Sequence, residues 1–420
     1  MDNAGLIVLA GVVIAGIGVI VPLLIHADKK RRRSKLEEDV ERLKEELKDI
    51  QAQLDPKSPP TVPPDFAELE PKAREYIDVG GYLNADDLLR IGNVHFWKSN
   101  YDPAIHYYRV ALDQAKQRDE KQLVGAAKDN IGVIYHIKGD QDEALKYHKQ
   151  SLEIHKEIGY RQGEASALGN IGNVFLLNGD LDEALKYHQA ALEVHKEVGS
   201  RQGEASDLGN IGLIYRARGD LDEALKYFQG VLEMEEEIGR PWSKANALGN
   251  IGLIYSEKGD LDEALKYLKE ALEVHKEVGY RQGEANQLGN IGLIYQAKGD
   301  LDEALKYHKE ALEIDKEVSY RLGEGQDLIA IGLIQKAKGA LDSALEYHEK
   351  GLKIHEEIGF REGQATALGN IGNVFLLKGD LDEALKYMRA ALKIFEAHGY
   401  MREVEQAKRN IAAIERMKNK

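Results

Sequence analysis

A 40-residue period is the feature of this sequence that most restricts its fold. The dipeptide Ile-Gly recurs at a constant step, and its isoleucines are Ile91, Ile131, Ile171, Ile211, Ile251, Ile291, Ile331 and Ile371. Ile411 keeps the step, although Ala412 replaces the glycine there. Units of this length that repeat in register fold as a stack in which each unit packs on its neighbours. We therefore predict eight similar units followed by one closing helix.

The third copy illustrates why each unit should contain two helices. The first helix is expected from about Glu164 to Asn178, because Leu168, Ile171 and Phe175 fall on one face at helical spacing. Gly172 costs about 1 kcal/mol relative to alanine inside a helix. Its recurrence in eight copies therefore predicts that the partner helix approaches closely at this point.

The boundary between the two helices has its own sequence signals. Gly179 is expected to end the first helix as a C-cap. Asp180 and Glu183 have the spacing of a capping box, which predicts the start of the second helix. Ala184 and Ala191 would give that second helix a small face for close packing.

This pattern resembles the tetratricopeptide repeat family from Asn84 to about Lys420. The residues on which the resemblance depends are Leu168, Ile171, Gly172, Phe175, Gly179, Asp180, Ala184 and Ala191. It implies an all-α, right-handed α-solenoid of eight helix pairs plus a C-terminal cap helix. The period is 40 rather than the usual 34, and Lys196 replaces the usual closing proline, so we expect the second helix to continue into "EVGSRQ". Such long repeats resemble those of kinesin light chains and Pins-type adaptors, which implies peptide binding on the concave face.

An asparagine precedes the isoleucine in most copies, and core packing does not explain it. Asparagine is a poor residue within a helix, and here it lies about 100° from the core face. In the family this stripe faces the inside of the superhelix. Arg90 and Ala330 interrupt the series, and Asn410 belongs to the cap. The candidate peptide-binding residues are Asn130, Asn170, Asn173, Asn210, Arg216, Asn250, Asn290, Asn370 and Asn373.

Two interpretations of the asparagine stripe remain open. An amide both donates and accepts hydrogen bonds, so a row of amides can hold the backbone of an extended peptide. Alternatively, the amides brace adjacent helices. In the binding interpretation, the residues that vary from one repeat to the next select the peptide side chains. The apolar anchors would be Trp97, Ile137, Leu177 and Leu377.

Other recurring polar residues have a structural interpretation beside a functional one. Arg161 and its equivalents lie at the junctions between repeats, where they could brace a carboxylate such as Glu164 or recognise an acidic ligand. His188 and His195 lie seven residues apart on the second helix. Phe228 and Leu268 replace the first of these histidines in other copies, so we expect packing rather than a metal site.

The N-terminal segment is expected to anchor the chain in a membrane. Residues 6–25 read "LIVLAGVVIAGIGVIVPLLI" without a charge, which at about 1.5 Å per residue spans roughly 30 Å, the thickness of a bilayer core. The basic cluster "KKRRRSK" follows it, and such clusters stay on the cytoplasmic side. We therefore expect a single-pass protein of the cytoplasmic membrane, with the N-terminus outside and the repeats in the cytoplasm. The near-identical repeats loosely favour a prokaryotic source.

Residues between the anchor and the repeats suggest a dimer and a spacer. Leu36, Val40, Leu43, Leu47, Ile50 and Leu54 form an a/d seam, which predicts a coiled-coil homodimer or a single solvated helix. "DPKSPPTVPPD" is proline-rich and predicts an extended spacer. The expected segments are anchor 1–28, basic cluster 29–35, coiled coil 36–54, linker 55–65, lead-in 66–83, repeats 84–402 and cap helix 403–420.

Composition narrows the classes of function. The net charge of −15 disfavours nucleic-acid binding, and the lack of cysteine rules out disulfides and thiolate metal sites. No "GxxxxGKS" or "HExxH" motif is present, so we expect no enzyme, no cofactor and no metal. The favoured function is a membrane-tethered adaptor that binds an unstructured or extended segment of another protein. The alternative is a scaffold that assembles with itself at the membrane.

Overall fold

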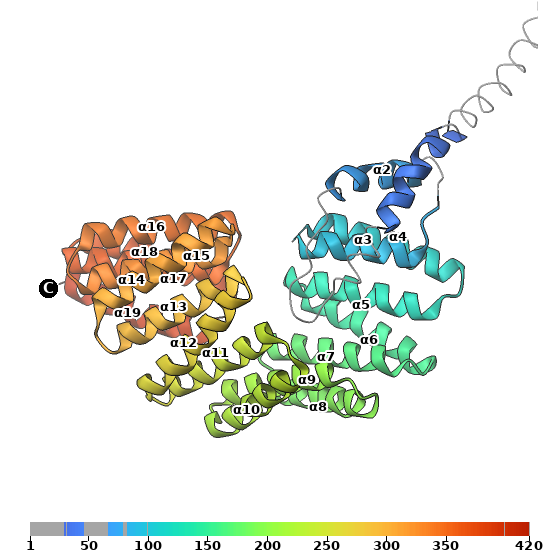
Figure 1. Ribbon diagram of the computed structural model, residues 1–420. Coiled ribbons are helices and arrows are strands. Elements are labelled where there is room, and N and C mark those ends of the chain that lie inside the picture. Colours follow the sequence, from blue (N-terminus) through green and yellow to red (C-terminus); the bar gives the residue numbers. More distant parts are fainter. Residues whose placement is uncertain are drawn as a thin grey trace, which may run out of the picture. The chain divides into compact units, whose positions relative to one another are not determined.

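The computed structural model describes residues 29–30, 32–45, 66–78, 82–98, 100–398 and 400–419, and every regular element in these ranges is a helix (Figure 1). The chain divides into two compact units, Met1–Ile214 and Tyr215–Lys420. The boundary lies within helix α9 (Arg201–Arg218). Each unit is described by itself below.

The first unit stacks helix pairs in the order of the sequence. Consecutive helices from α3 to α8 pack on one another, and α5 also contacts α3 and α7, the first helices of the neighbouring pairs. The helices are α2 (Phe66–Asp78), α3 (Ala85–Trp97), α4 (Tyr101–Gln117), α5 (Lys121–Ile137), α6 (Gln141–Glu157), α7 (Arg161–Leu177), α8 (Leu181–Glu197) and the first part of α9.

The second unit repeats the same arrangement. Here α11, α13, α15 and α17 are the first helices, and they form a contiguous row. After the end of α9, the helices are α10 (Leu221–Ile238), α11 (Pro241–Glu257), α12 (Leu261–Glu277), α13 (Arg281–Ala297), α14 (Leu301–Glu317), α15 (Arg321–Ala337), α16 (Leu341–Glu357), α17 (Arg361–Lys378), α18 (Leu381–Ala397) and α19 (Met401–Lys418). The predicted all-α solenoid of paired helices is therefore confirmed.

The recurring glycine of the first helix makes room for the second helix, as predicted. A Cβ atom on Gly172 would lie 2.7 Å from Cδ2 of His188. On Gly292 it would lie 2.7 Å from Cδ2 of His308, and on Gly252 it would lie 2.8 Å from Cγ of Leu268. The large side chain of the second helix therefore occupies the space that a Cβ atom would need.

The helix boundaries confirm the capping signals but correct the predicted extension. Gly179 has a φ of 78°, and the Asp180 side chain accepts a hydrogen bond from the Glu183 backbone N–H at 3.4 Å. However, α8 ends at Glu197 instead of continuing through "EVGSRQ", because Gly199 adopts a φ of 68°. The longer period also lengthens the first helix, which begins at Arg161 rather than Glu164.

The apolar seam of the predicted coiled coil packs partly on its own chain. Leu36, Val40 and Leu43 are buried in the same core cluster as Tyr76 of α2. Lys72 of α2 also donates a hydrogen bond of 3.1 Å to Asp39. These side chains are thus covered without a second chain. Leu47, Ile50 and Leu54 lie outside the described residues, so the homodimer stays a prediction.

Within the ranges that the structure describes, no helix is both long enough and apolar enough to span a bilayer. The predicted span, residues 6–25, and the proline-rich linker, residues 55–65, lie outside those ranges.

Candidate functional site

In the first unit, two asparagines of the stripe, Asn130 and Asn170, form hydrogen bonds between neighbouring first helices. Asn170 on α7 donates to Asp129 on α5 at 2.9 Å. Asn130 on α5 donates to Asn93 on α3 at 3.4 Å. The bracing interpretation therefore describes these two amides.

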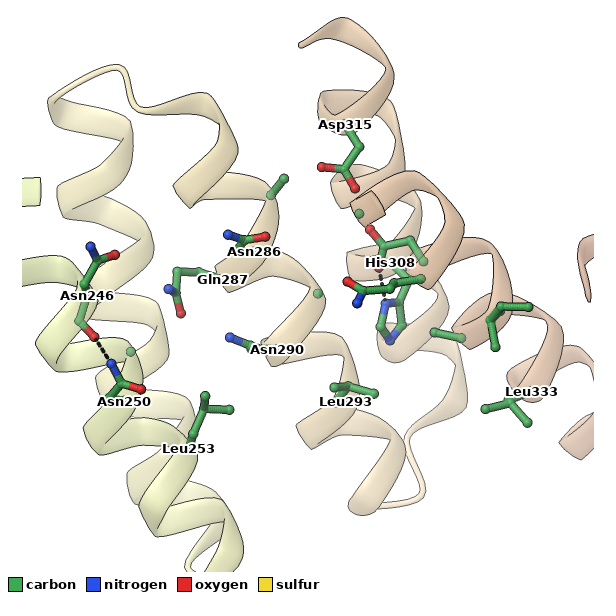
Figure 2. A pocket seen from close by; sticks show the side chains of 18 residues that line it. Asn246, Asn250, Leu253, Asn286, Gln287, Asn290, Leu293, His308, Asp315 and Leu333 are labelled. Carbon is green, nitrogen blue, oxygen red and sulfur yellow. Dashed lines mark hydrogen bonds and ion pairs between the residues drawn. The ribbon is translucent and has the colours of Figure 1, made fainter. Parts of the chain in front are cut away.

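In the second unit, Asn250 and Asn290 of the stripe line a cavity of about 720 Å³ (Figure 2). Asn250 bonds within its own helix, to the backbone oxygen of Asn246 at 3.0 Å. Asn290 makes no side-chain hydrogen bond to another described residue. The lining residues come from α11, α13, α14 and α15: Asn246, Gly249, Asn250, Leu253, Ala285, Asn286, Gln287, Gly289, Asn290, Leu293, His308, Asp315, Gly323, Gln326, Asp327, Ile329, Ala330 and Leu333.

The wall of this cavity combines polar and apolar side chains. Asn246, Asn250, Asn286 and Asn290 present amides from α11 and α13. On α15 the repeat departs from its consensus at Ile329 and Ala330, which line the cavity together with Leu333. Ala330, which interrupts the series of asparagines in the seventh copy, lines the same cavity. Sites that combine an apolar wall with a few fixed polar groups are typical of ligand pockets.

A buried acidic group within the cavity was missed by sequence reasoning. Asp315 on α14 and Asp327 on α15 are 2% and 7% exposed. His308 Nδ1 lies 2.8 Å from Asp327 Oδ1 (Figure 2). Burial and the neighbouring Asp327 carboxylate raise the pKa of Asp315 to about 7. Burial likewise raises the pKa of Asp327, and the hydrogen bond with His308 opposes this rise. Asp315 occupies a position where other repeats have a histidine, and this departure from the repeat was the feature of the sequence that could have identified it.

The other candidate residues do not line this cavity. Arg216 forms an ion pair with Glu257, with 2.6 Å between Nη2 and Oε1. Asn210, Asn370 and Asn373 are half-buried and make no side-chain hydrogen bond to another described residue. The structure thus brings Asn250 and Asn290 together at one site and leaves the remaining candidates dispersed.

Three of the proposed apolar anchors, Ile137, Leu177 and Leu377, are also outside the cavity. Leu177 is 63% exposed, and Leu377 and Ile137 are exposed as well. The side chain of Trp97 lies outside the described set. The leucines that line the cavity are Leu253, Leu293 and Leu333, none of which was a predicted anchor.

The junction arginines brace the repeats, as the structural interpretation predicted. Arg161 bonds to Glu164 on its own helix and to Glu197 at the end of α8. Arg281 repeats this arrangement with Glu284 and with Glu317, at 2.6 Å for the latter pair.

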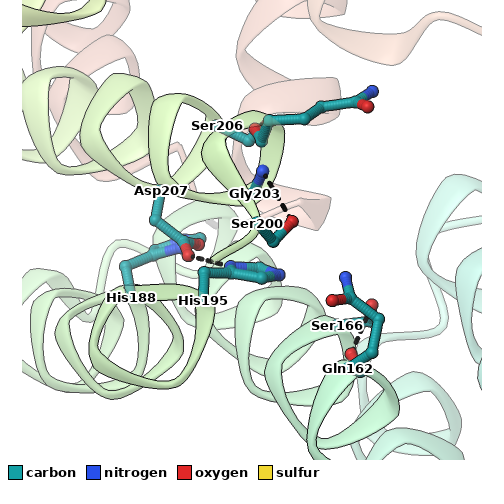
Figure 3. Close-up of polar contacts among 9 residues, drawn as sticks. Gln162, Ser166, His188, His195, Ser200, Gly203, Ser206 and Asp207 are labelled. Atoms are coloured by element: carbon teal, nitrogen blue, oxygen red, sulfur yellow. Dashed lines mark hydrogen bonds and ion pairs between the residues drawn. The ribbon is translucent and has the colours of Figure 1, made fainter. Parts of the chain in front are cut away.

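His188 and His195 belong to a buried polar cluster. Both approach Asp207 of α9, with Nδ1 to carboxylate distances of 3.4 and 2.7 Å (Figure 3). Among the described residues, no group of three His, Cys, Asp or Glu side chains is arranged to hold a metal ion.

A model of the tetratricopeptide repeat matches the sequence four times, over residues 85–157, 163–237, 243–317 and 325–397. The chain belongs to the tetratricopeptide repeat family. This confirms the family resemblance recognised in the sequence. No curated protein sequence is significantly similar to this tetratricopeptide repeat protein.

Solved structures with the same fold include two that align over most of the chain. The Rap conjugation gene regulator of plasmid pLS20, in complex with the Phr* peptide, is 19% identical, with 80% of this chain and 94% of that chain covered and a TM-score of 0.54. Aspartyl phosphate phosphatase F from Bacillus subtilis is 14% identical, with coverages of 86% and 94% and a TM-score of 0.54. The structure of repeats from a kinesin light chain of Podosopora anserina, so described, is 15% identical, with coverages of 46% and 96% and a TM-score of 0.39. At these identities the first two likenesses show the fold alone, so the expected lack of enzymatic activity stays a prediction.

Proposed function

We propose that this tetratricopeptide repeat protein is an adaptor that binds an extended peptide segment of a partner protein in the cavity between α11, α13 and α15. The supporting observation is the cavity itself, where Asn250 and Asn290 share the lining with apolar side chains such as Ile329 and Leu333. Amides can pair with the backbone of an extended peptide, and the apolar lining residues can receive its side chains. The Rap regulator, which has the same fold, was solved with a peptide bound.

The expected affinity is modest. A net hydrogen bond contributes about 0.5–1.5 kcal/mol, whereas association and ordering cost about 4–15 kcal/mol. Backbone contacts alone would barely offset that cost, so apolar contacts with residues such as Leu293 and Leu333 must contribute. We expect a dissociation constant in the micromolar range, about −8 kcal/mol.

Binding to a defined peptide mixture tests this proposal. The probe is a fluorescent library of hexapeptides with acetylated and amidated ends, and polarisation is measured with the full-length chain. The double variant Asn250→Ala, Asn290→Ala should bind about ten-fold more weakly without losing thermal stability. Asn410→Ala, in the cap helix α19, is the matched control and should bind normally. Equal binding by the double variant and wild type would show that the cavity is not the peptide site.

The alternative function is a scaffold that assembles with itself. Light scattering of the full-length chain over micromolar concentrations distinguishes the two functions. Concentration-dependent growth of assemblies that bind no peptide from the library would favour the scaffold over the adaptor.

The membrane tether is a separate part of the proposal. It rests on the uncharged residues 6–25 and the basic cluster after them, because moving a Lys or Arg to the bilayer centre costs about 2.5–3.5 kcal/mol. Protease added to intact cells should leave the repeats uncut if they lie in the cytoplasm. Digestion of the repeats under these conditions would contradict the proposed topology.

A further inference from the structure

One position near the end of each second helix is buried against the start of the next repeat. In the six second helices from α6 to α16, this position is occupied by a histidine four times and by an acidic residue twice. The residues are His155, His195, Glu235, His275, Asp315 and His355, and all six are buried. A buried carboxylate needs a cation or donors, because burial of an unpaired charge is costly.

The two carboxylates at this position have different surroundings. Glu235 is neutralised within the chain by Arg240, which is also buried, with 2.7 Å between Arg240 Nε and Glu235 Oε2. The residue that corresponds to Arg240 eighty positions later is Tyr320. Asp315 therefore lacks the internal cation that Glu235 has.

Asp315 instead faces a second carboxylate. In the first unit, Asp207 is approached by two imidazoles, His188 and His195 (Figure 3). The corresponding cluster of the second unit keeps one imidazole, His308 at 2.8 Å from Asp327, and has Asp315 where the other would be. Asp315 Oδ1 is buried and makes no hydrogen bond to any described residue.

We propose that the cavity binds a cationic group of an extended peptide, an ammonium or a guanidinium, beside Asp315 and Asp327. The cation supplies the donors that Asp315 Oδ1 lacks, and Gln287 Oε1, which is also buried without a partner, is a further acceptor in the same cavity. Among the described residues that line the cavity, none is Lys or Arg. Ile329 and Leu333 can pack against the aliphatic stem that precedes such a group in Lys or Arg. This inference rests on the proposed peptide-binding function.

The charges around the pair set the pH dependence of this binding. The titratable groups that face Asp315 are His308 on α14, Asp327 and Glu324 on α15, and Tyr320 before α15. Glu324 is held by Arg321. Since the pKa of Asp315 is raised to about 7, a proton occupies part of the unliganded cluster at neutral pH. A bound cation displaces that proton, so its affinity rises as the pH rises from 6 to 8.

The test compares matched peptides on the full-length chain. The probes are capped hexapeptide libraries in which one position is fixed as Lys, Arg or the neutral isostere norleucine, and one further library has a free amino terminus. Lys, Arg or the free amine should improve affinity at least ten-fold over the neutral capped library. Preference for the free amine alone would place the cation at the peptide terminus, whereas preference for Lys or Arg would place it on a side chain, and both support the inference.

Two substitutions copied from other repeats remove the unpaired charge. Asp315→His introduces the side chain that His275 has one repeat earlier and should abolish the preference for a cation. Tyr320→Arg copies Arg240, which neutralises Glu235, and should abolish the same preference while neutral peptides still bind. Asp302→Asn removes an exposed acid that pairs with Lys338 and should leave the preference unchanged. Circular dichroism confirms that each variant is folded.

Titration calorimetry in two buffers of different ionisation enthalpy gives a second readout on the unmodified chain. Binding of the Lys library at pH 7 should release a fraction of a proton. Equal affinity of wild type for the Lys, Arg, free-amine and neutral libraries would overturn the cation site and leave the peptide-binding function intact. Failure of every library to bind would refute the proposed function itself.

Discussion

Asn170 on α7 donates a hydrogen bond of 2.9 Å to Asp129 on α5, and Asp129 also lies 2.6 Å from Nδ1 of His148. This contact joins consecutive repeats. Asn290, in the same position of its repeat, makes no such contact with a described residue. Residues that look identical in the sequence therefore have different roles.

The first prediction compares these two asparagines. Asn170→Ala removes a hydrogen bond to a carboxylate, which contributes about 1.5–3 kcal/mol, and should lower the free energy of unfolding by at least about 1 kcal/mol. Asn290→Ala should be neutral or slightly stabilising, because alanine favours a helix more than asparagine does. Urea denaturation measures both. Equal losses would mean that Asn290 also braces the stack.

A second prediction concerns two glycines within first helices. A Cβ atom on Gly292 would lie 2.7 Å from Cδ2 of His308, whereas on Gly369 it would meet no atom within 4 Å. Gly292→Ala should therefore destabilise the protein by about 1–3 kcal/mol through overpacking. Gly369→Ala should stabilise it by about 0.5–1 kcal/mol through helix propensity. The midpoint of thermal unfolding gives the sign of each effect, and a stabilising Gly292→Ala would contradict the close approach.

The buried histidines should make the protein sensitive to mild acid. Burial lowers the pKa of His348 to about 4, so the unfolded chain binds this proton first as the pH falls below about 6.5. Stability from this residue is thus present above pH 6.5 and is lost between pH 6.5 and pH 4. His348→Leu copies Leu268, which occupies the same position two repeats earlier.

We expect His348→Leu to reduce the loss of stability between pH 7 and pH 5 by about 1–2 kcal/mol, at about 1.4 kcal/mol per pKa unit. Urea denaturation at both pH values gives this difference. His398→Leu, at an exposed histidine after α18, is the control and should leave the pH dependence unchanged. An identical acid response of wild type and His348→Leu would show that this imidazole is protonated in the folded protein.

Asp315 should produce the opposite pH dependence. Its pKa is raised from 3.8 to about 7 in the folded protein, so the native state binds more protons than the unfolded chain in this window. Stability from this residue therefore falls as the pH rises from 4 to 7. The gain in stability of Asp315→Asn over wild type should be larger at pH 8 than at pH 4. The difference between the two gains should be about 1–4 kcal/mol, at about 1.4 kcal/mol per pKa unit. A difference that does not change with pH would show that Asp315 is ionised without penalty.

The sequence by itself determined the repeat architecture. The 40-residue period, the glycines opposite the second helix and the Gly-Asp boundary all act over a few residues or recur at a fixed step. Local conformational preferences and regular spacing are therefore enough to predict them. The bracing role of Arg161 and Arg281 was also predictable, because one of the partners of each lies only three residues away.

Only the tertiary structure decided which repeated residues are available for binding. Asp315 and Asp327 meet because α14 packs on α15, and Asn170 is occupied because Asp129 replaces a recurring glycine on the neighbouring first helix. Likewise, Leu36, Val40 and Leu43 have the spacing of a coiled coil, but in the described part of the chain they pack into its own core. Heptad spacing identifies an apolar face without specifying what covers it. The polarity of a site depends on side chains that separate helices bring together, and no single repeat contains that information.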